Sequence, residues 1–265
     1  MACYAESSPG PALREHVACY WSLAADEPFE HRVLPDGCMD LLFDLRGGAE
    51  LVGAMTRALA VTQPRRSRVF GVRFRPGEAF ALIGVPAGDA RDRVIALGDA
   101  WGRSGAVLGD VVAAAPDDAA RVVALERALA GAIARPADRR VRRAVAQLIA
   151  APATRIAAIA GELGLGERQL ERAFELRVGI GPKQLARVAR LQAIARRLAV
   201  GPAAWARWAG ELGYADQAHL AREVRALAGV TPSALATEAA RGRTWPVAMS
   251  DSFKPPRAAR GTTRA

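Results

Sequence analysis

The spacing of hydrophobic positions divides the chain into two parts with different periods. Four segments of strand length come first, at residues 32–34, 38–45, 50–55 and 68–74. In the last of them Phe70, Val72 and Phe74 occupy every second position, which is the period of a strand with one buried face. Asp36-Gly37 is a turn signal between two of the runs, and a further apolar run covers residues 80–85. The pattern predicts a β-rich N-terminal part.

Helical spacing begins near residue 104. One apolar face contains Val107, Leu108, Val111 and Val112, and a second, after a break at Pro116, contains Val122, Leu125, Leu129 and Ile133. Arg135-Pro136 marks the predicted boundary between two domains. From residue 137 to about 240 the spacing stays helical, with an apolar face at 141–149 and a long apolar stripe at 182–200. About seven helices are predicted in this second domain.

The predicted fold class is therefore α+β. Residues 1–135 are expected to form a β-rich domain with a helical C-terminal part, and residues 137–240 an all-α domain. Residues 241–265 are rich in proline and basic residues and poor in apolar ones. Such a composition predicts a disordered basic tail.

The formal charge also differs between the two parts of the chain. Residues 1–135 contain 15 basic and 17 acidic side chains, a net charge of −2, whereas residues 136–265 contain 22 and 10, a net charge of +12. Only Lys183 and Lys254 are lysines, and so many arginines beside so many alanines are also typical of a GC-rich genome. The concentration of charge in the helical half, more than the arginine count, indicates a domain that binds a polyanion.

Composition argues against several other classes of protein. No apolar run reaches the roughly 18 residues that span a bilayer, and residues 1–10 lack the basic start of a secretory signal. We therefore expect a cytoplasmic protein without membrane contact. Cys3, Cys19 and Cys38 have no C-x-x-C spacing, which predicts reduced thiols near a core instead of a disulfide framework or a zinc site. The sequence predicts no metal site and no cofactor.

The helical half contains an internal repeat. Residues 160–165 (AGELGL) recur as residues 209–214 (AGELGY), and a one-residue insertion then precedes further matches at a fixed offset. These matched pairs are Leu170 and Leu220, Arg172 and Arg222, Phe174 and Val224, Gly179 and Gly229, and Pro182 and Pro232. Self-similarity at one period indicates two copies of one supersecondary unit.

Each copy has the pattern of a helix-turn-helix unit, at about residues 154–178 and 203–228. A short helix with an apolar face ends at Gly164 in the first copy and at Gly213 in the second. Glycine favours the left-handed conformation that often ends a helix. A second helix begins about three residues later and has apolar positions four residues apart. In a helix-turn-helix unit this second helix enters the major groove of DNA.

The polar face of each second helix supplies the candidate DNA-binding residues. They are Arg168, Gln169, Glu171 and Arg172 in the first copy, and Gln217, Ala218, Ala221 and Arg222 in the second. An inward leucine places the arginine two residues later about 200° away, on the exposed side. Arginine and glutamine pair in two-pronged fashion with guanine and adenine. Contact with phosphate alone is the alternative for both arginines.

At these residues the chain resembles the AraC/XylS family of transcription factors, in which a long helix joins two helix-turn-helix units. The resemblance covers roughly residues 138–238 and is strongest at 209–224 (AGELGYADQAHLAREV) and 228–233 (AGVTPS). The departures from the family pattern are Val224 in place of phenylalanine, Gly166 in place of a serine N-cap, and Trp205 and Trp208 in place of isoleucine. Segments 32–43 and 70–77 are similar to the small β-rich, cupin-like domain that precedes this module in some regulators.

The resemblance implies a non-enzymatic transcription regulator that binds double-stranded DNA. It also implies three further candidate partners: RNA polymerase, a small-molecule effector and a second copy of the chain. The residues do not identify an effector, so no effector-binding side chain is predicted.

Two other functions stay open at this point. An Ada-type DNA-repair methyl acceptor shares the helical module, but its chemistry needs a thiolate activated in a four-cysteine cluster. A hidden enzyme in the N-terminal half needs clustered polar groups, for which His16, His31, Asp36 and Asp40 are available. Their spacing matches no catalytic or metal signature, so we expect surface or turn positions for them.

Overall fold

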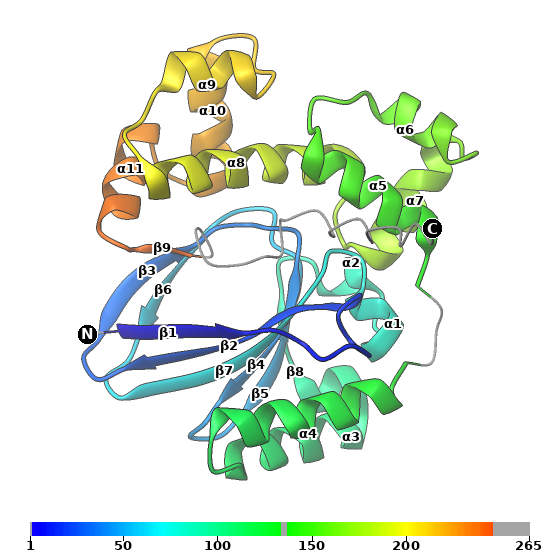
Figure 1. Ribbon diagram of the computed structural model, residues 1–265, viewed down its shortest axis with the longest axis vertical. Coiled ribbons are helices and arrows are strands. Elements are labelled where there is room, and N and C mark those ends of the chain that lie inside the picture. The colour runs from blue at the N-terminus through cyan, green and yellow to red at the C-terminus, as the bar shows by residue number, and fades with distance from the viewer. Residues whose placement is uncertain (1, 134–136, 246–265) are drawn as a thin grey trace, which may run out of the picture.

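The chain folds into a β-rich N-terminal part and a helical C-terminal part that lie against each other (Figure 1). The computed structural model describes residues 2–133 and 137–245. The N-terminal elements are β1 (Ala2–Ser7), β2 (Val17–Ala25), β3 (Phe29–Val33), β4 (Met39–Asp44), β5 (Ala49–Val52), β6 (Leu59–Gln63), β7 (Ser67–Phe74), α1 (Ala79–Ile83), α2 (Ala87–Ala90), β8 (Val94–Ala96), α3 (Leu97–Ala114) and α4 (Asp118–Gly131). The C-terminal elements are α5 (Arg139–Ala150), α6 (Ile156–Glu162), α7 (Glu167–Arg177), α8 (Pro182–Val200), α9 (Trp205–Glu211), α10 (Gln217–Ala228), α11 (Pro232–Ala240) and β9 (Thr244–Trp245).

Two sheets form the N-terminal part. The larger has the strand order β1-β2-β7-β4-β5-β8 and the smaller has the order β6-β3-β9. One face of the larger sheet is covered by α3 and α4 (Figure 1), and Phe70, Val72 and Phe74 are buried in the same apolar cluster as Leu108 and Leu125 of these helices. Strands of both sheets enclose a cavity on the opposite face. The predicted α+β class, with a β-rich N-terminal part and a helical C-terminal part, is confirmed.

The strand prediction is right for four segments and incomplete elsewhere. β3, β4, β5 and β7 coincide with the four predicted segments, with ends that differ by up to three residues, while β1, β2, β6 and β8 were not predicted. The apolar run at 80–85 contains the short helix α1 instead of a strand. Periodicity does not distinguish a buried strand from a buried helix in so short a run.

The predicted apolar faces of α3 and α4 are only partly buried. Leu108 and Val112 are buried, whereas Val107 and Val111 are 51% and 46% exposed. Adjacent helical residues point about 100° apart, so the pair at 107 and 111 lies at the rim of the contact with the sheet. Ile133 follows the end of α4 at Gly131 and is exposed.

The helix α8 is the axis of the C-terminal part. It begins at Pro182, a favourable residue for a first helical turn, and has the predicted bounds 182–200. Helices α5 to α7 gather near one end of α8 and α9 to α11 near the other (Figure 1), which makes seven helices among the described residues of this part. Of the described helices, none combines the length and apolar character needed to cross a membrane.

The two parts share apolar clusters. One cluster contains Phe74 and Leu82 together with Leu185 of α8, and a second contains Leu34, which follows β3, together with Leu191 and Leu220. The predicted boundary at Arg135-Pro136 lies outside the described residues.

The disorder predicted from residue 241 onward does not begin there. Thr244–Trp245 form β9, which pairs in parallel with β3, and the backbone N–H of Arg32 donates to the carbonyl of Arg243 at 2.7 Å. These backbone pairs order the segment in spite of its polar composition. The rest of the predicted tail, residues 246–265, lies outside the described residues.

Candidate nucleic-acid interface and ligand pocket

The two copies of the sequence repeat have the same turn geometry. Gly164, after α6, has φ +65°, and Gly213, after α9, has φ +75°, so both adopt the left-handed conformation that glycine favours. In both copies the next residue closes the turn with the same kind of bond: Leu165 N–H donates to the carbonyl of Ala160, and Tyr214 N–H to that of Ala209, each at 2.9 Å. The predicted glycine C-caps are confirmed.

The second helix of each copy buries one face and exposes the other. Leu170 and Phe174 of α7 and Leu220 and Val224 of α10 are buried in the apolar clusters. Seven of the eight candidate DNA-binding residues are exposed: Arg168, Gln169, Glu171, Arg172, Gln217, Ala218 and Arg222. The eighth, Ala221, is half-buried, because it lies next to the buried Leu220 at the edge of the packed face. A role of these residues in DNA binding stays a prediction.

The arginines on the exposed faces are available for an external partner. Within the described part of the chain, Arg168, Arg172 and Arg222 have neither an ion pair nor a side-chain hydrogen bond. By contrast, Arg187 lies 3.0 Å from Glu223 and Arg197 lies 2.9 Å from Glu211. The charge of the first three arginines is therefore not neutralised within the molecule.

Gln169 has a local contact that sequence reasoning missed. Its Oε1 accepts a hydrogen bond from the backbone N–H of Gly166 at 2.8 Å, at the start of α7. Gly166 has no side chain with which to cap the helix, and a glutamine three residues after the N-cap position makes the reciprocal contact of a capping box. This contact could have been predicted from the sequence, because a glutamine stands three residues after a glycine at the N-cap position.

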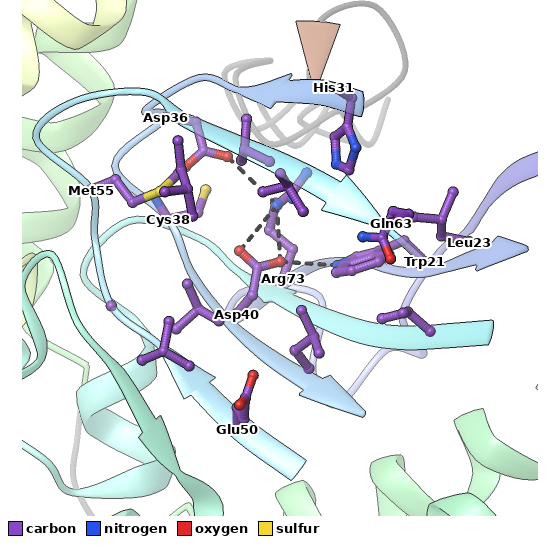
Figure 2. Close-up of a pocket in the computed structure, with 18 of the residues that line it drawn as sticks. Trp21, Leu23, His31, Asp36, Cys38, Asp40, Glu50, Met55, Gln63 and Arg73 are labelled. Atoms are coloured by element: carbon purple, nitrogen blue, oxygen red, sulfur yellow. Dashed lines mark hydrogen bonds and ion pairs between the residues drawn. The ribbon is translucent and has the colours of Figure 1, made fainter. Parts of the chain in front are cut away.

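A cavity of about 250 Å³ lies between the two sheets (Figure 2). Its lining is mostly apolar, and its leucine and valine side chains come from seven strands: Leu23, Val33, Leu42, Val52, Leu59, Val61, Val69 and Val94. Asp36, Asp40 and Arg73 form a polar group in this lining, with Trp21 beside them and His31 at one side (Figure 2). A mostly apolar cavity with a few grouped polar side chains is typical of a small-molecule site.

Strand register brings the polar group together. Asp40 of β4 lies directly opposite Arg73 of β7, and both belong to the positions that face the cavity because alternate residues of a strand share a face. Nε of Arg73 lies 3.2 Å from Oδ1 of Asp40 and 3.5 Å from Oδ2 of Asp36. Asp36 reaches the group from the loop before β4, where its Oδ1 accepts from the N–H of Cys38 at 2.9 Å.

Trp21 completes the polar group. Its Nε1 donates to Oδ1 of Asp40 at 2.9 Å. The indole ring lies across Gly71 of β7, where a Cβ would stand only 2.1 Å from the ring. Any other residue at position 71 would therefore displace Trp21 from Asp40.

Burial dominates the electrostatics of the cavity. It raises the pKa of Asp40 above the ordinary value, although the positive charge of Arg73 opposes the shift. It also lowers the pKa of His31 from 6.5 to about 4, so that this imidazole is neutral at physiological pH.

The expected surface or turn positions are wrong for His31 and Asp40, which lie in β3 and β4, whereas His16 is buried in the turn before β2. Asp36 does lie beside the predicted turn at Gly37, which has φ +76°. Asp36, Asp40 and His31 line the cavity, whereas His16 lies apart from it, with its Nδ1 2.8 Å from Oε2 of Glu78. Arg73, Trp21 and Glu78 were missed, because local spacing does not reveal which strands are neighbours.

The cysteines offer no support for a methyl-acceptor site. Burial raises the pKa of Cys19 to about 12 and that of Cys38 well above its ordinary value, which disfavours a thiolate. Cys3 is exposed, and all three thiols are free. Among the described residues no group of histidine, cysteine and acidic side chains is arranged to hold a metal ion.

Two domain families match the chain. Residues 5–96 match a domain of unknown function (DUF6597), and residues 159–238 match the helix-turn-helix domain. No curated protein matches the chain in sequence.

Several solved structures of ToxT from Vibrio cholerae are similar in fold. One at 1.65 Å resolution is 14% identical, covers 89% of this chain and 97% of its own, and has a TM-score of 0.44. ToxT from Vibrio cholerae O395 is 15% identical, with 89% and 96% covered and a TM-score of 0.42. Wild-type ToxT from strain SCE256, described as bound to an unsaturated fatty acid, is 14% identical, with 89% and 94% covered and a TM-score of 0.41.

The domain match agrees with the geometry of the two repeated units, with their glycine turns, buried inner faces and exposed outer faces. It supports a DNA-binding regulator and lends nothing to the Ada-type alternative. The C-terminal part of this chain carries a helix-turn-helix domain of the AraC type, preceded by a β-rich N-terminal domain.

Proposed function

We propose that this protein is a cytoplasmic, sequence-specific transcription regulator whose two helix-turn-helix units bind adjacent major grooves of DNA. The observation that carries the proposal is the exposed and unpaired state of Arg172 and Arg222 at matching positions of α7 and α10. Both are second helices of helix-turn-helix units, the kind of unit that places its second helix in the major groove. RNA polymerase and a second copy of the chain are further candidate partners.

The linking helix supports a fixed spacing of the two units. α8 has 19 residues, which corresponds to about 28 Å at 1.5 Å per residue. Its buried stripe packs into the shared apolar clusters, so the two units are held on one rigid element. Adjacent major grooves on one face of DNA lie about 34 Å apart, within reach of recognition helices at the two ends of such an element.

Control by a ligand in the cavity is part of the proposal. His31 and Val33 of β3 line the cavity, while Arg32 between them points the other way and pairs with Glu238 of α11. Beyond β3, Leu34 is buried in the cluster of the second helix-turn-helix unit, and the carbonyl of Pro35 accepts from Nε2 of Gln192 in α8 at 2.8 Å. A ligand that shifts β3 or the loop after it therefore acts directly on α8 and α11.

The experiment is a selection of bound sequences from a random DNA pool with the full-length protein, followed by substitutions. Arg172→Ala and Arg222→Ala should each weaken the selected site by about 1–3 kcal/mol and relax base preference at separate positions about 10 base pairs apart. Arg127→Ala is the matched control, because Arg127 is exposed on α4 of the N-terminal part. An equal loss on all DNA sequences would assign the arginine to phosphate contact and contradict base recognition by it.

A further inference from the structure

The described lining of the cavity between the two sheets contains one positively charged side chain and several carboxylates. Its positive charge is Arg73, which is flanked by the carboxylates of Asp36 and Asp40, and Glu50 also belongs to the lining. His31 adds no charge at physiological pH, since burial lowers its pKa to about 4. The guanidinium is thus compensated by carboxylates before any ligand enters.

The oxygens of the two flanking carboxylates are already engaged. Oδ1 of Asp40 accepts from Trp21 at 2.9 Å and lies 3.2 Å from Nε of Arg73, while its Oδ2 lies 3.5 Å from the same nitrogen. Oδ1 of Asp36 accepts from the N–H of Cys38 at 2.9 Å, and its Oδ2 lies 3.5 Å from Nε of Arg73. These two carboxylates therefore have little to offer an additional donor.

One donor of the same group remains without an acceptor. Nη1 of Arg73 is buried and has no hydrogen-bond partner among the described residues, and the Arg73 side chain as a whole is only 8% exposed. Figure 2 shows this side chain among the residues that line the cavity, between Asp36 and Asp40. A buried donor on a charged group is unfavourable until it finds an acceptor. What the site lacks is an acceptor, not a charge.

We propose that this cavity binds a small apolar molecule that ends in an uncharged oxygen acceptor, such as an amide carbonyl, which accepts a hydrogen bond from Nη1 of Arg73. The aliphatic lining holds the apolar body of the ligand and Trp21 flanks its head. The proposal rests on the proposed function in one respect, namely that the occupant is the effector of a DNA-binding regulator.

Charged head groups fit the same geometry less well. A ligand carboxylate would be a third anion around one guanidinium, in a low-dielectric site where repulsion is strong. Burial already raises the pKa of Asp40 in spite of Arg73, which indicates that negative charge is poorly compensated here. A ligand ammonium placed at Asp36 and Asp40 would lie beside the guanidinium of Arg73 and would leave its Nη1 without an acceptor.

The test compares three probes that share one alkyl chain and differ in the head group: octanamide, octanoate and octylamine. Binding to the full-length protein is measured by titration calorimetry and by the shift in melting temperature, without DNA. We expect octanamide to bind at least about tenfold more tightly than either charged probe. Octylamine lacks an acceptor for Nη1, a loss of about this size for one hydrogen bond to a charged group, and octanoate is repelled by Asp36 and Asp40. Tighter binding of octanoate or octylamine, or no binding of octanamide, would overturn the proposal.

Substitutions then test whether Arg73 is responsible for the preference for octanamide. Arg73→Lys keeps the charge but removes the forked donors, so the advantage of octanamide over octylamine should disappear. Val61→Phe narrows the apolar end and should weaken all three probes, and circular dichroism shows whether either variant is folded. Arg127→Lys on α4 is the matched control and should bind like the wild type. An unchanged amide preference in folded Arg73→Lys would refute the role of Nη1.

Failure of this inference is distinguishable from failure of the proposed function. DNA binding by the wild-type protein is measured in parallel without any probe. Loss of the amide preference with intact DNA binding contradicts only the ligand chemistry. Absence of DNA binding with an intact amide preference contradicts only the proposed function.

Discussion

Arg32 and Glu238 are 206 residues apart in the chain and form a two-pronged ion pair between the N-terminal and C-terminal parts. Nε of Arg32 lies 2.7 Å from Oε2 of Glu238, and Nη2 lies 3.0 Å from Oε1. Nη1 of the same arginine donates to the carbonyl of Ala228 at 3.2 Å, at the end of α10. One side chain of β3 therefore contacts both of the last two helices.

Glu238→Gln should destabilise the protein by about 1 kcal/mol, because it removes one charge of a geometrically favourable and half-buried pair. The matched control is Glu27→Gln, whose partner Arg65 lies 3.0 Å away with both side chains more than 60% exposed. The control should change stability by no more than about 0.5 kcal/mol. Urea unfolding of both variants gives the comparison, and equal effects would contradict a structural role for the Arg32–Glu238 pair.

Gln192→Ala should destabilise the protein more than an ordinary glutamine substitution. Gln192 is buried, and its Nε2 is the donor to the carbonyl of Pro35. Removing the donor leaves a buried carbonyl unsatisfied, which costs about 1–3 kcal/mol. Gln147→Ala on α5 is the control, because the hydrogen bond of Gln147 with Glu162 is exposed to solvent. A smaller loss of unfolding free energy for Gln192→Ala than for the control would be inconsistent with this contact.

The lowered pKa of His31 predicts that the protein loses stability in mild acid. Its folded pKa of about 4 lies below the unfolded value of 6.5, so between these values the unfolded state binds a proton that the folded state does not. Stability should therefore fall as the pH is lowered from about 6.5 to about 4, by roughly 2–3 kcal/mol for this group. His31→Gln should show a flatter profile over the same range. Urea unfolding at several pH values checks the prediction, and parallel profiles for the two proteins would exclude His31 as the cause.

DNA affinity should depend steeply on salt, because the half of the chain with a net charge of +12 must displace counterions from phosphates. For roughly six phosphate contacts we expect a loss of about a thousandfold between 50 and 200 mM salt. Fluorescence anisotropy with a fixed DNA duplex measures the slope. Arg127→Ala on α4 should leave the slope unchanged, and a flat plot for the wild type would mean that the basic half has another partner.

The sequence alone determined the helical half in detail. The bounds of α8, the duplicated units and the glycine turns all follow from periodicity and local conformational preference, which depend on residues a few positions apart. The exposure of Arg172 and Arg222 follows for the same reason, because a buried leucine two positions earlier fixes the direction of each side chain.

Only the tertiary structure decided the N-terminal site and its connection to the helices. Asp36, Asp40 and Arg73 meet through the register between β4 and β7, and Trp21 joins them from a strand that the sequence did not predict. The pairing of β9 with β3 likewise orders residues whose composition predicts disorder. Such contacts join residues far apart in the chain, and the period of a strand indicates which face is buried but not which strand lies beside it.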